Sequence, residues 1–162
     1  MAVRLGEVMV EMGLLNESQV EQILEAQRDD RRPFGDLAER LFGVAPESVD
    51  RAWAEQYAQI TVQIDPRSEV FDSDALALVS CRQAWQFRIL PIRRDGHEIM
   101  IATTRDHLPR ALRFAMRRFS EPVYFVIAEA QHLGAALAER FPMHGLTADD
   151  IEGVGPIVVG AA

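Results

Sequence analysis

The residues with the most informative spacing form a repeat near the start of the chain. Residues 4–27, RLGEVMVEMGLLNESQVEQILEAQ, recur in altered form at 33–56 as PFGDLAERLFGVAPESVDRAWAEQ, an offset of 29 positions. This offset predicts two small helical hairpins stacked together. Two such copies make a pseudo-twofold site, and its chemistry would be recognition of a ligand that is itself nearly twofold. The paired positions are Gly6 with Gly35, Val20 with Val49, Leu24 with Trp53, and Gln27 with Gln56.

Residues that would carry catalysis are sparse. All 17 basic residues are arginine, so the chain has no lysine for a Walker A phosphate loop or a Schiff base. The single cysteine, Cys81, excludes an internal disulfide and a cysteine-based zinc site, and it fits a reducing compartment. The four histidines are too far apart for an H-x-x-x-H pattern; they are His97, His107, His132 and His144. We therefore expect a protein that is not an enzyme and has no metal or cofactor.

Composition and charge predict two lobes with different surfaces. The 162 residues are 48% hydrophobic and 26% charged, an ordinary globular profile. No apolar run approaches the roughly 20 residues of a membrane span, so we expect a cytoplasmic protein that is not inserted in a membrane. The net charge of −8 is uneven, because residues 1–60 carry six arginines against twelve acids, whereas residues 80–120 carry nine arginines against three acids.

Helices must position the repeated residues. The first helix shows an apolar face at i, i+3, i+4 and i+7 spacing, made by Leu5, Val8, Met9 and Met12. Asn16 followed by Gln19 resembles a capping box that opens the next helix. In the second copy, Pro46 lies near the first turn of the corresponding helix. The pattern predicts a four-helix lobe of two repeated hairpins over residues 1–58.

After residue 60 the pattern alternates between strands and helices. We predict strands at 61–65, 88–94, 97–104 and 123–129, with helices at 74–87, 108–119 and 131–141. Asp95-Gly96 is a strong hairpin signal between the second and third of these strands. The overall class is therefore α+β, with a small α/β lobe over residues 60–141 and a mostly antiparallel sheet. Residues 142–162 are Gly-rich and are predicted to be a tail or a truncated linker.

The first copy fits the pattern R-L-G-x-x-(apolar)2-x-x-G-(apolar)2-x4-(apolar)-x-x-x-L-x-x-Q. On this basis residues 4–27 resemble the first cyclic-di-GMP-binding motif of MshEN domains, the N-terminal domains of type II secretion and type IV pilus assembly ATPases. Residues 74–104 resemble the companion lobe of the same family. The resemblance covers about residues 3–141 and implies an MshEN domain without the ATPase domain that usually follows.

The resemblance also implies which residues meet the ligand. In the family, the arginine and backbone of R-L-G meet a guanine or a phosphate, leucines pack on base faces, and the glutamine hydrogen-bonds. The matching positions in the first copy are Arg4, Leu5, Gly6, Val20, Leu24 and Gln27, and those in the second copy are Arg32, Phe34, Gly35, Val49, Trp53 and Gln56. Arginine suits this role because it can fork onto the acceptor edge of guanine.

The second copy departs from the motif. Pro33 stands at the arginine position, one residue after Arg32, and Phe34 replaces the leucine. The motif glycine comes one position late, at Gly43, and Trp53 replaces the leucine that would contact a base.

Several of these residues also have a plainer interpretation. Periodicity alone would place Leu5, Val20 and Leu24 in an ordinary core, and Trp53 and Trp85 also fit a core. The stripe of Arg110, Arg113 and Arg117 on one predicted helix is either a solvated face or a docking surface.

Two functions follow from these observations. The first is a non-catalytic, cytoplasmic cyclic-di-GMP receptor. The second is a docking adaptor that binds no nucleotide and contacts a protein partner such as an inner-membrane secretion or pilus component. We expect no nucleic-acid partner in either case.

Overall fold

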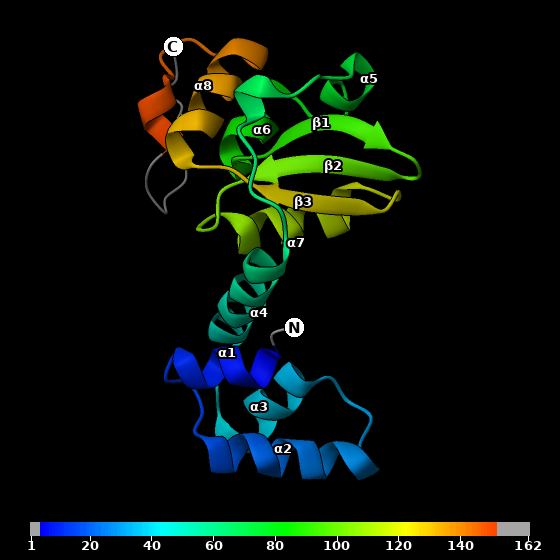
Figure 1. Cartoon of the computed structure of the whole chain (residues 1–162), viewed down its shortest axis with the longest axis vertical. Coiled ribbons are helices and arrows are strands. Elements are labelled where there is room, and N and C mark those ends of the chain that lie inside the picture. Colours follow the sequence, from blue (N-terminus) through cyan, green and yellow to red (C-terminus); the bar gives the residue numbers. More distant parts are fainter. Residues whose placement is uncertain (1–3, 152–162) are drawn as a thin grey trace. The chain divides into compact units, whose positions relative to one another are not determined.

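The chain divides into two compact units, Met1–Ile60 and Thr61–Ala162. The computed structural model (Figure 1) describes residues 4–151. The glycines at positions 153, 155 and 160, which the sequence assigned to a tail, lie outside the described residues.

The N-terminal unit consists of four helices in two pairs. Their bounds are α1 (Leu5–Glu11), α2 (Glu17–Asp29), α3 (Phe34–Phe42) and α4 (Pro46–Ile60). The starts of α1 and α3, and those of α2 and α4, are separated by the same 29-residue offset as the two copies of the sequence repeat. The predicted capping box opens α2: the Gln19 backbone N–H donates to Asn16 Oδ1 at 2.8 Å, and the Asn16 N–H donates to Gln19 Oε1 at 2.9 Å.

The two hairpins of this unit interlock. Helix α1 packs against α4, and α2 packs against α3, which are equivalent pairs under exchange of the two copies. The helices meet over one apolar core, made by Val8, Met9, Leu15, Ile23, Leu37, Ala38 and Ala52. Neither hairpin alone can bury its apolar face. The unit is therefore stabilised by the apolar surface that the two hairpins bury against each other.

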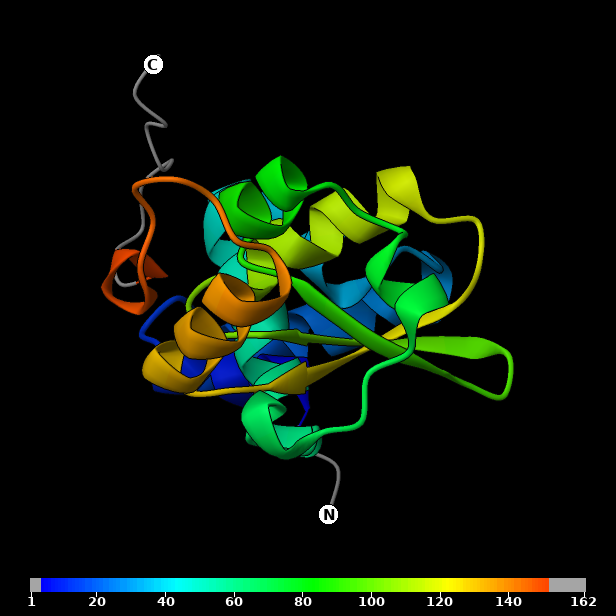
Figure 2. The ribbon, with the colours of Figure 1, turned by 90° about the horizontal axis from the view of Figure 1, so that it is seen from above.

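The C-terminal unit is built around a three-stranded sheet in the order β1-β2-β3. Its strands are β1 (Leu90–Asp95), β2 (Glu98–Thr103) and β3 (Val123–Ile127), and its helices are η1 (Pro66–Ser68), α5 (Ser73–Leu76), α6 (Cys81–Phe87), α7 (Leu108–Arg118), α8 (Ala130–Arg140) and η2 (Ala148–Ile151). Seen from above, the strands run between α7 on one side and α8 on the other (Figure 2). The α+β class is confirmed.

The sheet is mixed, whereas the sequence analysis expected a mostly antiparallel one. Strands β1 and β2 form the predicted antiparallel hairpin, but β2 and β3 pair in parallel. The reason is the connection: α7 carries the chain across a face of the sheet, so that β3 enters in the same direction as β2.

The strand expected at 61–65 is reduced to a single bridge between Gln63 and Ile127. Two backbone hydrogen bonds hold it, Ile64 N–H to the Ile127 carbonyl at 2.9 Å and Ile127 N–H to the Val62 carbonyl at 3.0 Å. Val62 remains 64% exposed, so this segment has no buried face that would favour a longer strand.

The helix expected at 74–87 is two helices, α5 and α6. Ser80 starts the second one, because its hydroxyl accepts the Gln83 N–H at 3.1 Å while the Gln83 side chain accepts the Ser80 N–H at 3.0 Å. Trp85 is 1% exposed and donates its indole N–H to the Phe141 carbonyl at 2.7 Å, so its predicted place in the core is confirmed.

Part of the predicted tail is folded onto α8. Residues Ala148–Ile151 form η2, and Ile151 is fully buried. Gly134 of α8 allows this approach, because a Cβ at that position would lie 2.2 Å from the Ala148 carbonyl oxygen. The C-terminal unit therefore extends beyond residue 141.

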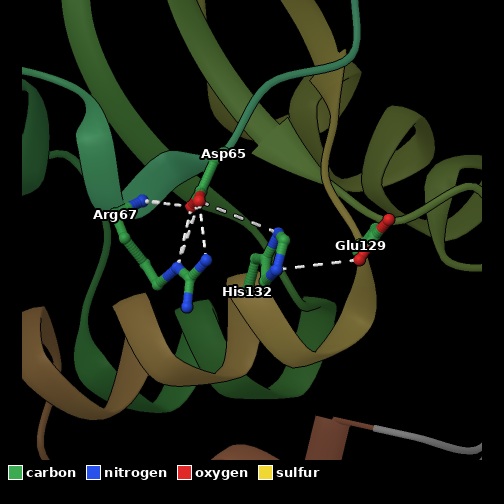
Figure 3. A network of polar contacts seen from close by, with 4 residues as sticks. All are labelled: Asp65, Arg67, Glu129 and His132. Atoms are coloured by element: carbon green, nitrogen blue, oxygen red, sulfur yellow. Dashed lines mark hydrogen bonds and ion pairs between the residues drawn. The ribbon is translucent and has the colours of Figure 1, made fainter.

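A polar network joins η1 to α8 (Figure 3). The Asp65 carboxylate accepts three hydrogen bonds from the Arg67 guanidinium, the shortest from Nη2 to Oδ2 at 2.7 Å, and its Oδ2 lies 4.0 Å from His132 Nδ1. His132 Nε2 is 3.7 Å from the Glu129 carboxylate. The hydrogen bond from the Arg67 side chain is the main cause that lowers the pKa of Asp65 to about 2.

The Gly134 contact predicts the effect of a single methyl group. Overpacking against a backbone costs about 1–3 kcal/mol, whereas alanine gains about 1 kcal/mol of helix propensity over glycine. We therefore expect Gly134→Ala to lower the free energy of unfolding, measured by urea denaturation. Glu139→Ala, an exposed change on the same helix, is the control and should have little effect. An unchanged or raised stability of Gly134→Ala would show that η2 does not rest on this glycine.

The lowered pKa of Asp65 predicts a contribution to acid stability. Because the folded-state pKa is below that of the unfolded chain, the contribution is complete above about pH 4 and is lost as the pH falls toward 2. Asp65→Asn should therefore lose less stability than the natural chain between pH 5 and pH 2.5, measured from urea midpoints. Asp106→Asn controls for removal of one exposed carboxylate. Equal acid sensitivity of Asp65→Asn and the natural chain would contradict the prediction.

Candidate functional site

The glycines of the repeat set the distance between the two helices of each hairpin. A Cβ at Gly6 would lie 3.0 Å from Val20 Cγ1, and one at Gly35 would lie 2.6 Å from Val49 Cγ1. The same glycine–valine contact thus occurs once in each copy. Gly6 also faces Phe34 of the other copy, whose Cζ would be 3.1 Å from such a Cβ. Both glycines are buried, and they serve the packing of the helices.

Four other candidate residues pack against the same core. Leu5, Val20, Phe34 and Val49 are partly buried and contact the core cluster of the N-terminal unit. For the buried part of each of these four side chains, packing in an ordinary core is a sufficient explanation.

Leu24 and Trp53 behave differently from that core. Leu24 is 48% exposed on α2, and Trp53 is 42% exposed on α4. They are matched positions of the repeat, as are Met12 and Leu41, which are 38% and 51% exposed, so each copy presents two large apolar side chains to solvent. The indole of Trp53 lies near the ring of Tyr57, with centroids 5.9 Å apart. A core role does not account for these two residues.

The polar candidates lie at the ends of the helices. Arg4 precedes α1 and is exposed, and its backbone N–H donates to the Glu7 carboxylate at 3.3 Å. The Gln27 side chain donates to the Arg32 carbonyl at 3.1 Å, so it fixes the start of the second copy. Arg32 itself is half-buried and lies 3.5 Å from Asp30. Gln56, the partner of Gln27 in the repeat, is half-buried.

An acidic groove that the sequence analysis missed lies between α1 and α2. It is open to solvent, has a volume of about 420 Å³ and is lined by Gly6, Glu7, Val10, Glu11, Glu17, Val20 and Glu21. The signal was available in the sequence, because Glu7 with Glu11 and Glu17 with Glu21 are each four residues apart and share a helix face. The groove favours cations and opposes phosphates.

The predicted arginine stripe on α7 is divided in the structure. Arg113 and Arg117 are exposed, beside Met116 at 81% exposure. Arg110 is half-buried, and its guanidinium carbon lies 5.4 Å from the centroid of the Phe87 ring. The exposed part of the stripe is therefore Arg113 and Arg117 alone.

These features define a class of protein: a helical repeat that presents matched exposed residues, followed by a small α+β unit with a mixed sheet. The MshEN domain model matches residues 56–145, more than half of the chain. The chain belongs to the MshEN domain family, and the predicted family is confirmed. The match covers the end of α4 and the C-terminal unit as far as residue 145, whereas most of the repeat precedes it.

Two kinds of solved structure are similar to the chain. A structure described as MshE with cdg is 28% identical, with a TM-score of 0.47, and the alignment covers 86% of this chain and 99% of that chain. The N-terminal domain of XpsE is 18% identical, with a TM-score of 0.44, covering 85% and 93% respectively. No curated protein matches the chain.

Within residues 4–151, helices long and apolar enough to cross a membrane are absent.

The contact between Gly35 and Val49 predicts that the effect of changing the glycine on stability depends on the residue at position 49. Gly35→Ala should lower the free energy of unfolding by about 1–3 kcal/mol, because valine is stiff and Cγ1 has little freedom to move away. In a chain that already carries Val49→Ala, the same change should cost clearly less, because the methyl group it meets is gone. A double-mutant cycle by urea denaturation measures the difference. An equal cost of Gly35→Ala in both backgrounds would sink the prediction.

Proposed function

We propose that this chain is a non-catalytic cytoplasmic receptor for cyclic di-GMP, related to the N-terminal domains of secretion and pilus ATPases. Its ligand site is the helical repeat of the N-terminal unit. The observation that carries the proposal is the exposure of Leu24 and Trp53 at matched positions of two interlocked hairpins. At this pair of positions, a ligand with two equivalent halves meets a large apolar side chain in each half of the site.

The chemistry of the exposed residues suits a guanine dinucleotide. Guanine is flat and apolar on its faces, and stacking of a base on an aromatic side chain contributes about 1–3 kcal/mol. Trp53 offers such a face, and Leu24 offers an aliphatic one. Arg4 and Arg32 supply guanidinium groups that match either the acceptor edge of guanine or a phosphate.

The acidic groove restricts how such a ligand binds. Four glutamates line it, and they repel the two phosphates of the dinucleotide. In the proposed complex the phosphates therefore lie toward Arg4 and Arg32, outside the groove. The close glycine–valine packing keeps α1 and α2 in a fixed relation, so the groove and the exposed Leu24 keep fixed positions on that hairpin.

The second candidate function is a docking adaptor that binds a protein partner, such as an inner-membrane component of a secretion or pilus system. The observation that favours it is the face of α7, where Met116 is exposed between Arg113 and Arg117. An apolar side chain flanked by cations suits an acidic partner surface.

Titration with cyclic di-GMP separates the two functions. Calorimetry on the natural chain at about 100 μM should show saturable binding. Arg4→Ala should weaken it roughly 10- to 150-fold, the loss of about 1.5–3 kcal/mol expected for one charge-assisted contact. Arg113→Ala removes the same charge from the C-terminal unit and should leave the affinity unchanged.

Ligand stacking on Trp53 should also change its fluorescence, whereas the buried Trp85 should not respond. Trp53→Phe is the matched control, because it should remove the fluorescence change and keep an aromatic face. If the natural chain shows no saturable binding, the receptor proposal fails and the adaptor takes its place.

A further inference from the structure

Arg88 is a buried arginine at the junction of α6 and β1. It ends α6 in the left-handed conformation, with φ of 48°, and is 2% exposed. Its carbonyl accepts the Thr103 hydroxyl at 2.8 Å, so its backbone is fixed to the last residue of β2. The sheet therefore fixes the Cα of Arg88, from which the side chain extends.

Among residues 4–151, no carboxylate forms an ion pair with the guanidinium of Arg88. Its Nε is buried and has no hydrogen-bond partner among residues 4–151, and its Nη1 lies 3.5 Å from the Gln86 carbonyl, a long contact. Burial lowers the pKa of Arg88, and the charge of Arg110 lowers it further. A buried cation without a counter-charge is costly, which points to an anion that completes the site.

Arg110 supplies a second guanidinium near the first. It lies in the first turn of α7, over the ring of Phe87, and that ring stacks on Phe114 with centroids 4.2 Å apart. The aromatic pair holds the cation at the junction of α6 and α7.

The fold places both arginines where anions commonly bind. Strand β2, helix α7 and strand β3 form a parallel crossover, and α7 begins just beyond the carboxyl end of β2. The turn into α7 is fixed by Thr104 and His107, whose hydroxyl and Nδ1 are 2.6 Å apart. The N-terminal turn of an 11-residue helix adds its own partial positive charge at this end of the strand.

We propose that Arg88 and Arg110 form a binding site for a phosphate group at the carboxyl end of β2. Two guanidinium groups match the charge of a dianion such as phosphate better than that of a single carboxylate. The site is made by residues of the C-terminal unit and uses none of the residues of the cyclic-di-GMP site proposed on the repeat. The phosphate is either the free ion or a monoester on a small molecule.

The test is a titration of the full chain, followed by backbone amide NMR shifts, at constant ionic strength. The probes are inorganic phosphate, glycerol phosphate as a monoester, and acetate as a monoanion. We expect saturable shifts of the backbone amides at positions 103–108, 110 and 111 with both phosphates. Tighter binding of the monoester assigns the ester as the source, and tighter binding of inorganic phosphate assigns the free ion; either result supports the site.

Charge-matched variants decide whether the two arginines are responsible. Arg110→Gln and Arg88→Gln should each weaken phosphate binding about tenfold or more. Arg82→Gln, an exposed change on α6, should leave it unchanged. If Arg88→Gln fails to fold, the comparison of phosphate binding by Arg110→Gln and by Arg82→Gln still tests the site. Equal weakening in Arg82→Gln and Arg110→Gln, acetate binding as tight as phosphate, or no saturable shift in the natural chain would each overturn the proposal.

Discussion

The close contact between a glycine and a valine, made once in each hairpin, is the constraint on which the N-terminal unit depends. Gly6 against Val20 and Gly35 against Val49 bring the paired helices nearer than any larger residue would permit. The apolar core then closes between the two hairpins, and this leaves Leu24 and Trp53 on the surface. The motif therefore includes residues that set the helix spacing and residues that the spacing leaves exposed, besides those, such as Leu5, that pack against the core.

The repeat is only approximately symmetric. Helix α3 runs from Phe34 to Phe42 and is two residues longer than α1, and its left-handed glycine, Gly43, comes one position later in the repeat than Gly13. The two halves also differ in their exposed side chains, an indole in one and a leucine in the other. Each half of a twofold ligand would therefore meet a distinct environment.

Much of the fold could be predicted from local patterns. Helix starts in the repeat follow from Asn16 and Pro46, and the β1-β2 hairpin follows from the turn at Gly96, because these features depend on neighbours in the sequence. The parallel pairing of β3, the bridge at Gln63 and the burial of Ile151 depend on distant residues, so no local pattern revealed them. At the candidate site, residue types predicted the motif, but not which members are buried. That Arg88 is buried and has no ion-pair partner within residues 4–151 could not be predicted either, because an arginine beside an apolar run is common at the exposed end of a strand.

The folding of η2 onto α8 fixes where the C-terminal unit stops. A fragment ended at Phe141, where the helical pattern runs out, would keep the acceptor for Trp85 yet strip Ile151 from its buried position and uncover the backbone at Gly134. Such a fragment would expose an apolar strip along one helix and tend to self-associate in solution. The shortest fragment of this unit that keeps its apolar surface covered therefore includes residue 151. This is ten positions beyond the end of the helix that the sequence predicts at 131–141.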